Sequence, residues 1–261
     1  MAEFTEYAPG TPSWIDLQTA DVDKGAAFYH ALFGWDRQDL GPDAGGYGFF
    51  LKDGKMVAGV GPTMSPEAPT AWSTYVSVAD ADATVAKAKA AGGTVAVEPM
   101  DVMTAGRMAF VTDPTGATIG IWQPRDHKGA QLANETGTFG WSECQTRDVE
   151  KANAFYAAVF GWRPTAFEGG GPGQYTVFEN DGRGIGGCMT MPDMVPKEIP
   201  AYWLTYFIVD DADAAVSTAT AQGGGVLAPA MDVPTVGRIA VLTDPSGAAF
   251  AIIKPSMPPQ S

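Results

Sequence analysis

The sequence predicts an α+β fold of two tandem domains, each built from two βαβββ modules. Three observations lead to this prediction: the chain repeats itself once, strand patterns alternate with amphipathic helix patterns inside each repeat, and a short polar stretch separates the repeats. Of the 261 residues, 45% are hydrophobic and 18% are charged. This composition provides enough apolar material for packed cores and too little charge for a disordered chain.

The repeat is visible by direct comparison of the two halves. Residues 14–35 read WIDLQTADVDKGAAFYHALFGW, and residues 141–162 read WSECQTRDVEKANAFYAAVFGW. We therefore place a first domain at 11–124 and a second domain at 138–255. The stretch 125–137 between them holds charged and small polar residues without periodicity, as is typical of a surface linker.

The first module of the first domain begins with alternating side chains at 14–19, which predict a strand. Asp21 can cap the start of the following helix, and Gly34 can end it without steric cost. Two strands joined by a hairpin turn at Asp53-Gly54 follow, at 47–51 and 55–60. The buried stripe of the helix is expected at four positions with helical spacing: Ala27, Phe28, Ala31 and Leu32.

The second module repeats this order. An alanine-rich helix is expected at 81–91, capped by Asp80 and closed by Gly92-Gly93. The strands around it are expected at 72–78, 94–97, 107–112 and 118–122.

The charge of the chain limits its partners. Sixteen Lys and Arg residues stand against thirty Asp and Glu residues, which gives a net charge of −14. A field of this sign repels polyphosphate and anionic lipid, so neither nucleic acid nor a membrane is expected as a partner. A small cation, or an aromatic compound that carries an amine, would be attracted if an acidic group lined its pocket.

Targeting and cysteine signals point to the cytoplasm. Cys144 and Cys188 are the two cysteines, too few for a disulfide scaffold or a multi-cysteine metal cluster. Residues 1–10 carry acids and prolines rather than a basic flank and an apolar stretch, so we expect no secretory signal. The apolar run at 201–209 is shorter than the roughly 18 residues of a membrane-spanning helix.

Two motifs resemble those of a known superfamily. FYHALFGW at 28–35 and TDPTG at 112–116 have counterparts at 155–162 and 243–247, and together they look like the vicinal oxygen chelate superfamily. That superfamily includes glyoxalase I, bleomycin-resistance proteins and ring-cleaving dioxygenases. The resemblance implies that two modules pair into a curved mixed sheet, and that the sheet surrounds a cavity for the ligand in each domain.

The same resemblance allows the metal positions to be checked. Relatives that use a metal place ligands on the first and last strands of the modules, which implies Trp14 and Gly120 in the first domain and Trp141 and Ala251 in the second. The intermediate positions fall near Gly59, Ser73, Gly187 and Leu204. Because divalent transition metals need several nitrogen, oxygen or sulfur donors, we expect the metal-free type, with no cofactor. The two histidines, His30 and His127, are expected at the surface without a role.

The concave face presents an indole, a carboxylate and a carboxamide in each domain. Strand alternation places Trp14, Asp16 and Gln18 on one face, and Trp141, Glu143 and Gln145 on the matching face. Further wall residues by alternation are Tyr47, Phe49, Tyr75 and Trp122 in the first domain, and Tyr175, Tyr206 and Phe250 in the second. A planar ligand could stack on the indole while the acid pairs with an amine or a hydroxyl group. The alternative is that the tryptophans are core and the acids cap backbone amides.

The glycine-rich tract 169–173 is expected as a lip over the second cavity.

These residues favour metal-independent binding of a small aromatic molecule, neutral or cationic. The binding would serve antibiotic or secondary-metabolite sequestration, self-resistance, or delivery of an intermediate to a biosynthetic oxygenase. The alternative is a metal-free lyase, isomerase or hydroxylase-type enzyme with Asp16 or Glu143 as general base. A surface antigen or regulatory protein is a third class, for which the sequence offers no specific feature. Because the two domains are already fused, we expect a monomer or a weak homodimer.

Overall fold

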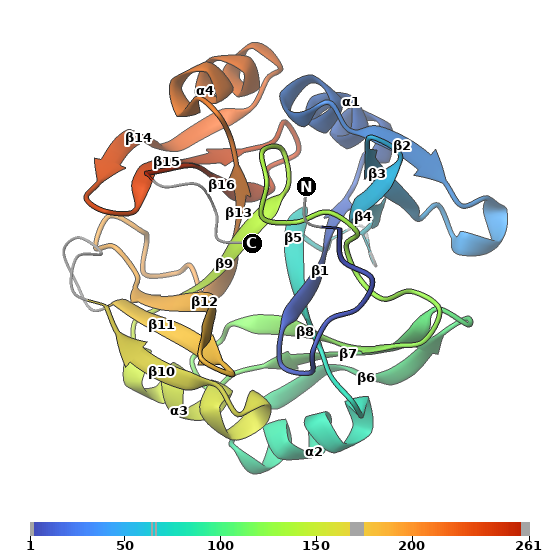
Figure 1. The fold of residues 1–261 in the computed structure, drawn as a ribbon, viewed down its shortest axis with the longest axis vertical. Helices are drawn as coiled ribbons and strands as arrows, with labels where there is room; N and C mark the ends of the chain where they lie inside the picture. Colours follow the sequence, from blue (N-terminus) through green and yellow to red (C-terminus); the bar gives the residue numbers. More distant parts are fainter. Residues whose placement is uncertain (1–2, 64, 66, 168–174, 257–261) are drawn as a thin grey trace.

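The computed structural model describes residues 3–63, 65, 67–167 and 175–256, which form two eight-stranded sheets with helices packed around them (Figure 1). The first domain contains β1 (Pro12–Thr19), α1 (Val22–Phe33), β2 (Asp36–Asp39), the 3₁₀ turn η1 (Pro42–Ala44), β3 (Gly48–Lys52), β4 (Lys55–Pro62), β5 (Ala71–Ser77), α2 (Ala81–Ala90), β6 (Thr94–Val102), β7 (Gly106–Thr112) and β8 (Thr118–Pro124).

The second domain repeats this order. It contains β9 (Phe139–Thr146), α3 (Val149–Phe160), β10 (Arg163–Ala166), β11 (Tyr175–Asn180), β12 (Arg183–Thr190), β13 (Tyr202–Ile208), α4 (Ala212–Ala221), β14 (Gly225–Val233), β15 (Gly237–Thr243) and β16 (Ala249–Pro255).

The sheet topology confirms the α+β fold of two tandem domains. Strand order in the first sheet is β2-β3-β4-β1-β5-β8-β7-β6, and the second sheet has the equivalent order. Within each module the first and last strands of the chain order pair in parallel, as β1 does with β4, whereas the two modules meet through the antiparallel pair β1 and β5. Each sheet is therefore mixed and continuous across its two modules.

Local signals in the first module are largely confirmed. Asp21 accepts a hydrogen bond from the Lys24 amide at 3.0 Å, and Gly34 ends α1 in the left-handed conformation. Asp53 and Gly54 both have positive φ, as the hairpin between β3 and β4 requires. The strand β2, with the polar sequence DRQD, was not predicted, because it pairs only with β3 and carries no hydrophobic alternation.

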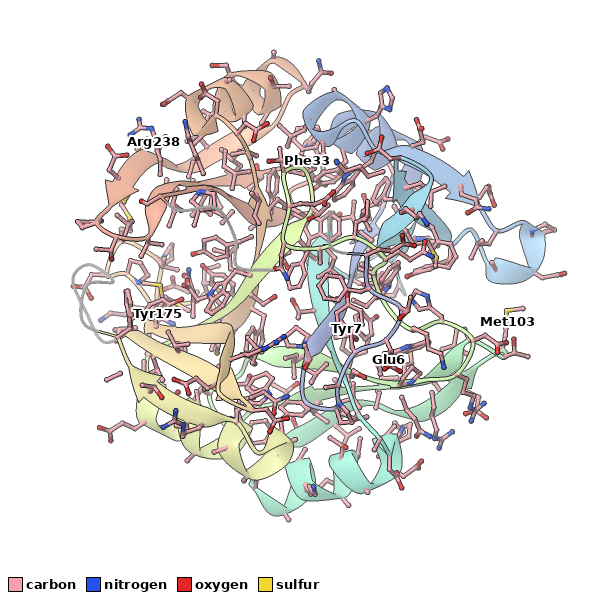
Figure 2. The ribbon with its side chains drawn as sticks, in the orientation of Figure 1. Glu6, Tyr7, Phe33, Met103, Tyr175 and Arg238 are labelled. Atoms are coloured by element: carbon pink, nitrogen blue, oxygen red, sulfur yellow. The ribbon has the colours of Figure 1, made fainter. Side chains whose placement is uncertain are left out.

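The predicted buried stripe of α1 is wrong at two positions. Ala27 and Ala31 are exposed, and the buried side of the helix runs through Gly25, Phe28, Tyr29 and Phe33. The prediction failed because helical spacing alone does not show which side of a helix is covered, and α1 also packs against the second domain. Figure 2 shows Phe33 at this junction, where its ring lies 5.0 Å from that of Phe207.

The two domains meet through their helix-bearing faces. One buried cluster joins the first module of domain 1 to the second module of domain 2, and another joins the remaining two modules. In Figure 1, α1 accordingly lies beside α4, and α2 lies beside α3. At the centre, the Thr74 hydroxyl shares a hydrogen bond of 2.7 Å with Ser142. Neither hydrophobic core belongs to a single domain.

The repeated motifs hold this interface together. In domain 2, Tyr156 of the FYAAVFGW segment donates a hydrogen bond to Asp113 of the first TDPTG turn at 2.8 Å, and Trp203 donates to Tyr156 at 2.8 Å. In domain 1, Tyr29 points in the same way toward Asp244, at 3.5 Å. The motifs that carry the resemblance to the superfamily therefore have a structural role in this chain.

The linker is more than a surface connection. Ala130, Leu132 and Ala133 are buried, and Ala130 and Gln131 donate backbone hydrogen bonds to Ser13 and Met56 of domain 1. We call residues 125–133 the strap, because they lie along domain 1. The tract 169–173, expected as a lip, lies outside the described residues. Among the helices that the structure describes, none is long and apolar enough to cross a membrane.

Candidate functional site

The side chains predicted for the domain 1 site come together on the concave face of its sheet. Trp14, Tyr75 and Trp122 belong to one buried cluster that is separate from the interdomain cores, and Phe49 packs against it. The strands bring them together because Trp14 pairs with Tyr75 and Tyr75 pairs with Gly120 in register. The matching region of domain 2 is marked in Figure 2 by Tyr175 on β11.

Asp16 is the polar centre of the domain 1 site. Its Oδ2 atom accepts hydrogen bonds from the hydroxyl groups of Tyr75 at 2.9 Å and Tyr47 at 3.5 Å. Tyr47 in turn accepts a hydrogen bond from the Trp14 indole at 3.2 Å. The alternative in which the acid caps backbone amides is not seen, since both partners of Asp16 are tyrosines.

The second carboxyl oxygen of Asp16 lacks a partner. Asp16 is 4% exposed, and Oδ1 forms no hydrogen bond with any residue that the structure describes. Burial raises the pKa of Asp16 to about 7, although the hydrogen bonds from Tyr75 and Tyr47 oppose the shift. Near neutral pH this carboxyl group can therefore either accept or donate a hydrogen bond.

Side chains fill the centre of the expected domain 1 cavity. Trp14 and Tyr75 are each 4% exposed and Trp122 is 6% exposed, whereas Tyr47 and Phe49 at its border are half-buried. Gln18, half-buried at the end of β1, takes no part in the Asp16 hydrogen bonds. Two cavities of about 220 and 210 Å³ lie between the domains, and no predicted site residue lines either one.

His127 was predicted at the surface without a role, and the predicted position is wrong, because its ring packs inside the domain 1 cluster. Its ring centroid lies 4.3 Å from that of Trp14 in an edge-to-face arrangement and 5.5 Å from that of Phe49, nearly parallel. Both ring nitrogens are buried without a hydrogen-bond partner in the described part of the chain. Burial lowers the pKa of His127 to about 4. The strap thus places a neutral imidazole in the site.

Replacing His127 with phenylalanine is expected to remove part of the acid sensitivity of the fold. Between pH 6.5 and about 4 the unfolded chain binds a proton that folded His127 cannot, so stability falls as pH falls. The loss is on the order of 3 kcal/mol for this histidine. Urea unfolding of the two proteins at pH 7 and pH 4.5 measures it. His30→Phe, on the exposed side of α1, should keep the natural acid loss; an equal acid loss in His127→Phe would contradict the assignment.

Domain 2 contains a related but better-paired cluster. Glu143 Oε1 accepts hydrogen bonds from Tyr206 at 3.0 Å and from the Gln145 amide at 3.1 Å. Tyr202 donates to Gln145 Oε1 at 2.8 Å, and the Trp141 indole donates to Tyr175 at 3.0 Å. Burial raises the pKa of Glu143 above its usual range, against the hydrogen bonds from Gln145 and the tyrosines. Trp141 and Tyr175 are only half-buried, so this face is less closed than that of domain 1.

The residues at the metal positions of the superfamily do not fit a metal ion. Gly59 pairs with Asp16 across β1 and β4, and a side chain at Gly59 would collide with the Tyr47 hydroxyl group. A side chain at Gly120 would likewise collide with the Tyr75 ring. Among the described residues there is no group of three or more His, Cys, Asp or Glu side chains in ligating positions. One carboxylate among phenols is a poor donor set for a divalent transition metal.

The structure adds residues that sequence reasoning missed. Phe110 lies in the domain 1 cluster with its ring 5.1 Å from Tyr75, and Tyr202 joins the domain 2 cluster. Alternation along their strands could have found both. The predicted position of Phe250 on the concave face is wrong. Its side chain is fully buried on the interdomain side, where its ring centroid lies 5.7 Å from that of Tyr29.

The fold and the repeated motifs define the class of protein. The family model for the glyoxalase/bleomycin resistance protein/dioxygenase superfamily matches residues 11–121 and 138–252. The chain belongs to this superfamily, with two tandem domains.

Individual relatives cover almost the whole chain. "Putative glyoxylase CFP32" of Mycobacterium tuberculosis is 44% identical over 262 residues, covering 98% of this chain and 99% of the relative. "Anthracycline biosynthesis protein DauV" of Streptomyces sp. (strain C5) is 36% identical over 267 residues, covering 96% and 95%.

Solved structures show the same fold at low sequence identity. The Mn(II)-bound glyoxalase from Novosphingobium aromaticivorans has a TM-score of 0.63 at 15% identity, covering 96% of this chain and 85% of that one. A catechol 2,3-dioxygenase has a TM-score of 0.64 at 16% identity, covering 98% and 91%.

Proposed function

We propose that this protein binds a small, flat aromatic molecule on the concave face of its sheet without using a metal ion. The observation that carries the proposal is Asp16, a carboxyl group enclosed by aromatic side chains with one oxygen unpaired among the described residues. An unpaired buried carboxyl oxygen is costly, and a hydroxyl or amine group of a ligand would satisfy it. The surrounding rings supply the stacking surface for a flat molecule.

The relatives support the same chemical class. One of them is named for anthracycline biosynthesis, and anthracyclines are flat, hydroxylated aromatic molecules that carry an amine. A net charge of −14 favours such an amine over an anion. In the proposed role, the protein sequesters the compound, protects its producer, or carries an intermediate to an oxygenase in the cytoplasm.

A second candidate function is metal-free catalysis. It is favoured by the pKa of Asp16, raised to about 7, since a general base works best when its pKa lies near the working pH. Glu143, whose pKa is also raised by burial, is the equivalent group in domain 2. In this case Asp16 would accept a proton from a ligand atom held against the aromatic wall.

Replacing Asp16 with asparagine separates the two functions. Daunorubicin, which carries an amine, and the neutral 1,4-dihydroxyanthraquinone are titrated against the full chain while tryptophan fluorescence is followed. For a binding protein, Asp16→Asn should weaken daunorubicin binding about 10- to 100-fold, the effect of losing one charged hydrogen bond. Asp43→Asn, an exposed acid on the same domain, is the control and should bind like the natural protein.

The outcomes distinguish the candidates. If both compounds fail to quench fluorescence at high micromolar concentration, the binding proposal is refuted. If Asp16→Asn keeps full affinity but loses conversion of the bound compound, Asp16 is a base and the second candidate holds. Glu143→Gln, measured in parallel, reports whether domain 2 takes part.

A further inference from the structure

The imidazole of His127 fills a slot walled by three aromatic side chains. Trp14 meets its ring edge-to-face, Phe49 lies almost parallel to it with an interplanar angle of 24°, and the Trp122 ring centroid is 5.6 Å away. Stacked and edge-to-face contacts at these separations are those that flat rings prefer. The slot therefore has the shape of a stacking site for one flat ring.

The ring is held in this slot by packing alone. Neither imidazole nitrogen has a hydrogen-bond partner among the residues that the structure describes, and both are buried. A buried polar atom without a partner destabilises the arrangement that contains it. Turning the imidazole out to solvent would give both nitrogens water as a partner, so a ligand ring could replace it without breaking a side-chain hydrogen bond.

The backbone around His127 is fixed, so the side chain alone can move. His127 donates its amide hydrogen to Ala105 at 3.0 Å and accepts a hydrogen bond from the Trp122 indole on its carbonyl at 3.0 Å. Further along the strap, Ala130 donates to Ser13 at 2.9 Å. His127 is half-buried as a residue, and its neighbours in the chain, Asp126 and Lys128, are exposed, so the strap lies at the protein surface at this point.

Domain 2 has no equivalent slot in its described residues. Phe49 pairs in register with Gly59, and the residue that pairs with Gly187 in the same way is Val177. The domain 2 counterpart of Trp122 is Ile253: Trp122 pairs with Met108 in the first sheet, and Ile253 pairs with Ile239 in the second. Two of the three aromatic walls are therefore aliphatic in domain 2.

We propose that His127 is the gate residue of the domain 1 site: its imidazole occupies the place where one ring of a flat aromatic ligand stacks on Phe49 and meets Trp14 edge-to-face, and binding turns the imidazole out to solvent. The inference rests on the proposed function and deepens it, because it assigns the ligand to domain 1 and names what the ligand displaces. A flat ring system with hydroxyl or amine groups on one edge fits best, since its face would meet Phe49 and its polar edge would be available to Asp16.

Two variants of His127 are expected to change affinity in opposite directions. His127→Ala empties the slot, so the binding-competent form no longer has to be reached by displacing a side chain, and affinity for 1,4-dihydroxyanthraquinone should rise at least about 10-fold. His127→Phe fills the slot with a ring that has no unpaired nitrogen and should lower affinity by about 10-fold. His30→Ala and His30→Phe are the matched controls and should leave affinity unchanged. Each affinity is measured by quenching of tryptophan fluorescence.

Nuclear magnetic resonance of the natural protein gives a second, independent readout. The chain has only two histidines, so the imidazole ¹⁵N signals of His127 and His30 can be followed separately. On addition of 1,4-dihydroxyanthraquinone, the His127 signals should move to the positions of a solvated imidazole while those of His30 stay in place. This measurement also decides the matter if a variant fails to fold.

The outcomes separate this inference from the proposed function. If the natural protein binds the probe but both His127 variants bind it equally well, or both bind it more weakly, the gate is refuted and the binding function stands. Unshifted His127 signals in the saturated protein would have the same meaning. If neither the natural protein nor His127→Ala binds either compound, the proposed function and the gate both fail.

Discussion

Replacing Asp113 with alanine is expected to lower the free energy of unfolding by at least about 3 kcal/mol. Asp113 is 4% exposed, and its Oδ1 atom accepts hydrogen bonds from the backbone amides of Thr115, Gly116 and Ala117 at 2.7 to 3.1 Å. Its Oδ2 atom accepts the hydroxyl hydrogen of Tyr156 from the other domain. Alanine would leave the buried Ala117 amide and the buried Tyr156 hydroxyl group without their acceptor, and it would remove one hydrogen bond between the two domains.

Urea unfolding followed by circular dichroism measures this loss. Tyr156→Phe is the matched variant, because it leaves the turn intact. It removes the hydrogen bond to Asp113 and also the one that the Trp203 indole donates to Tyr156, so about 2 kcal/mol is expected for it. Asp126→Ala, at an exposed position of the strap, should be neutral. If Asp113→Ala were no more destabilising than Tyr156→Phe, the turn would not be the main source of the effect.

Replacing Asp16 with asparagine is expected to stabilise the protein increasingly as pH rises. The folded pKa of Asp16 is about 7 against a usual value of 3.8, so between these values the unfolded chain has released a proton that the folded chain still holds. Stability therefore falls as pH rises through this window and is level above it. The difference is on the order of 4 kcal/mol, and asparagine, which cannot ionise, removes it.

Thermal unfolding of both proteins at pH 5 and pH 8 tests this expectation. The gain from Asp16→Asn should be larger at pH 8, whereas exposed Asp43→Asn should give the same small change at both values. A constant difference between Asp16→Asn and the natural protein would show that Asp16 is already ionised at pH 5. The same unfolding data show that Asp16→Asn is folded, so a loss of daunorubicin affinity in this variant cannot be caused by unfolding.

The part of the site that lies on strands could be predicted from the sequence. Strand alternation is strictly periodic, so Trp14, Asp16, Tyr47 and Tyr75 were placed on one face without knowledge of the fold, and the structure joins Tyr47 and Tyr75 to Asp16 by hydrogen bonds. The helix cap at Asp21 and the hairpin turn at Asp53-Gly54 could also be predicted, because the residues that form them lie close together in the sequence. What these residues bind stays a prediction.

The rest depended on contacts between distant segments. His127 lies in a stretch without periodicity, and nothing near it in the sequence indicates that the chain turns back onto Trp14, more than a hundred positions away. The buried stripe of α1 was predicted wrongly at Ala27 and Ala31 for a related reason. Phe28 and Tyr29 face the other domain, where their rings lie 6.1 and 5.7 Å from Phe250, and helical spacing alone does not show which neighbour a helix will meet.

Each of the two interdomain clusters is built from one module of each domain, and this has a consequence for how the chain unfolds. Each domain contributes residues to both hydrophobic cores. A domain separated from the other would therefore expose a large apolar surface to water. The two domains therefore resemble the subunits of a dimer that a covalent linker joins. The linker raises the effective concentration of each domain around the other. Unfolding of one domain removes half of the residues from each core, so the two domains should unfold together in a single cooperative transition.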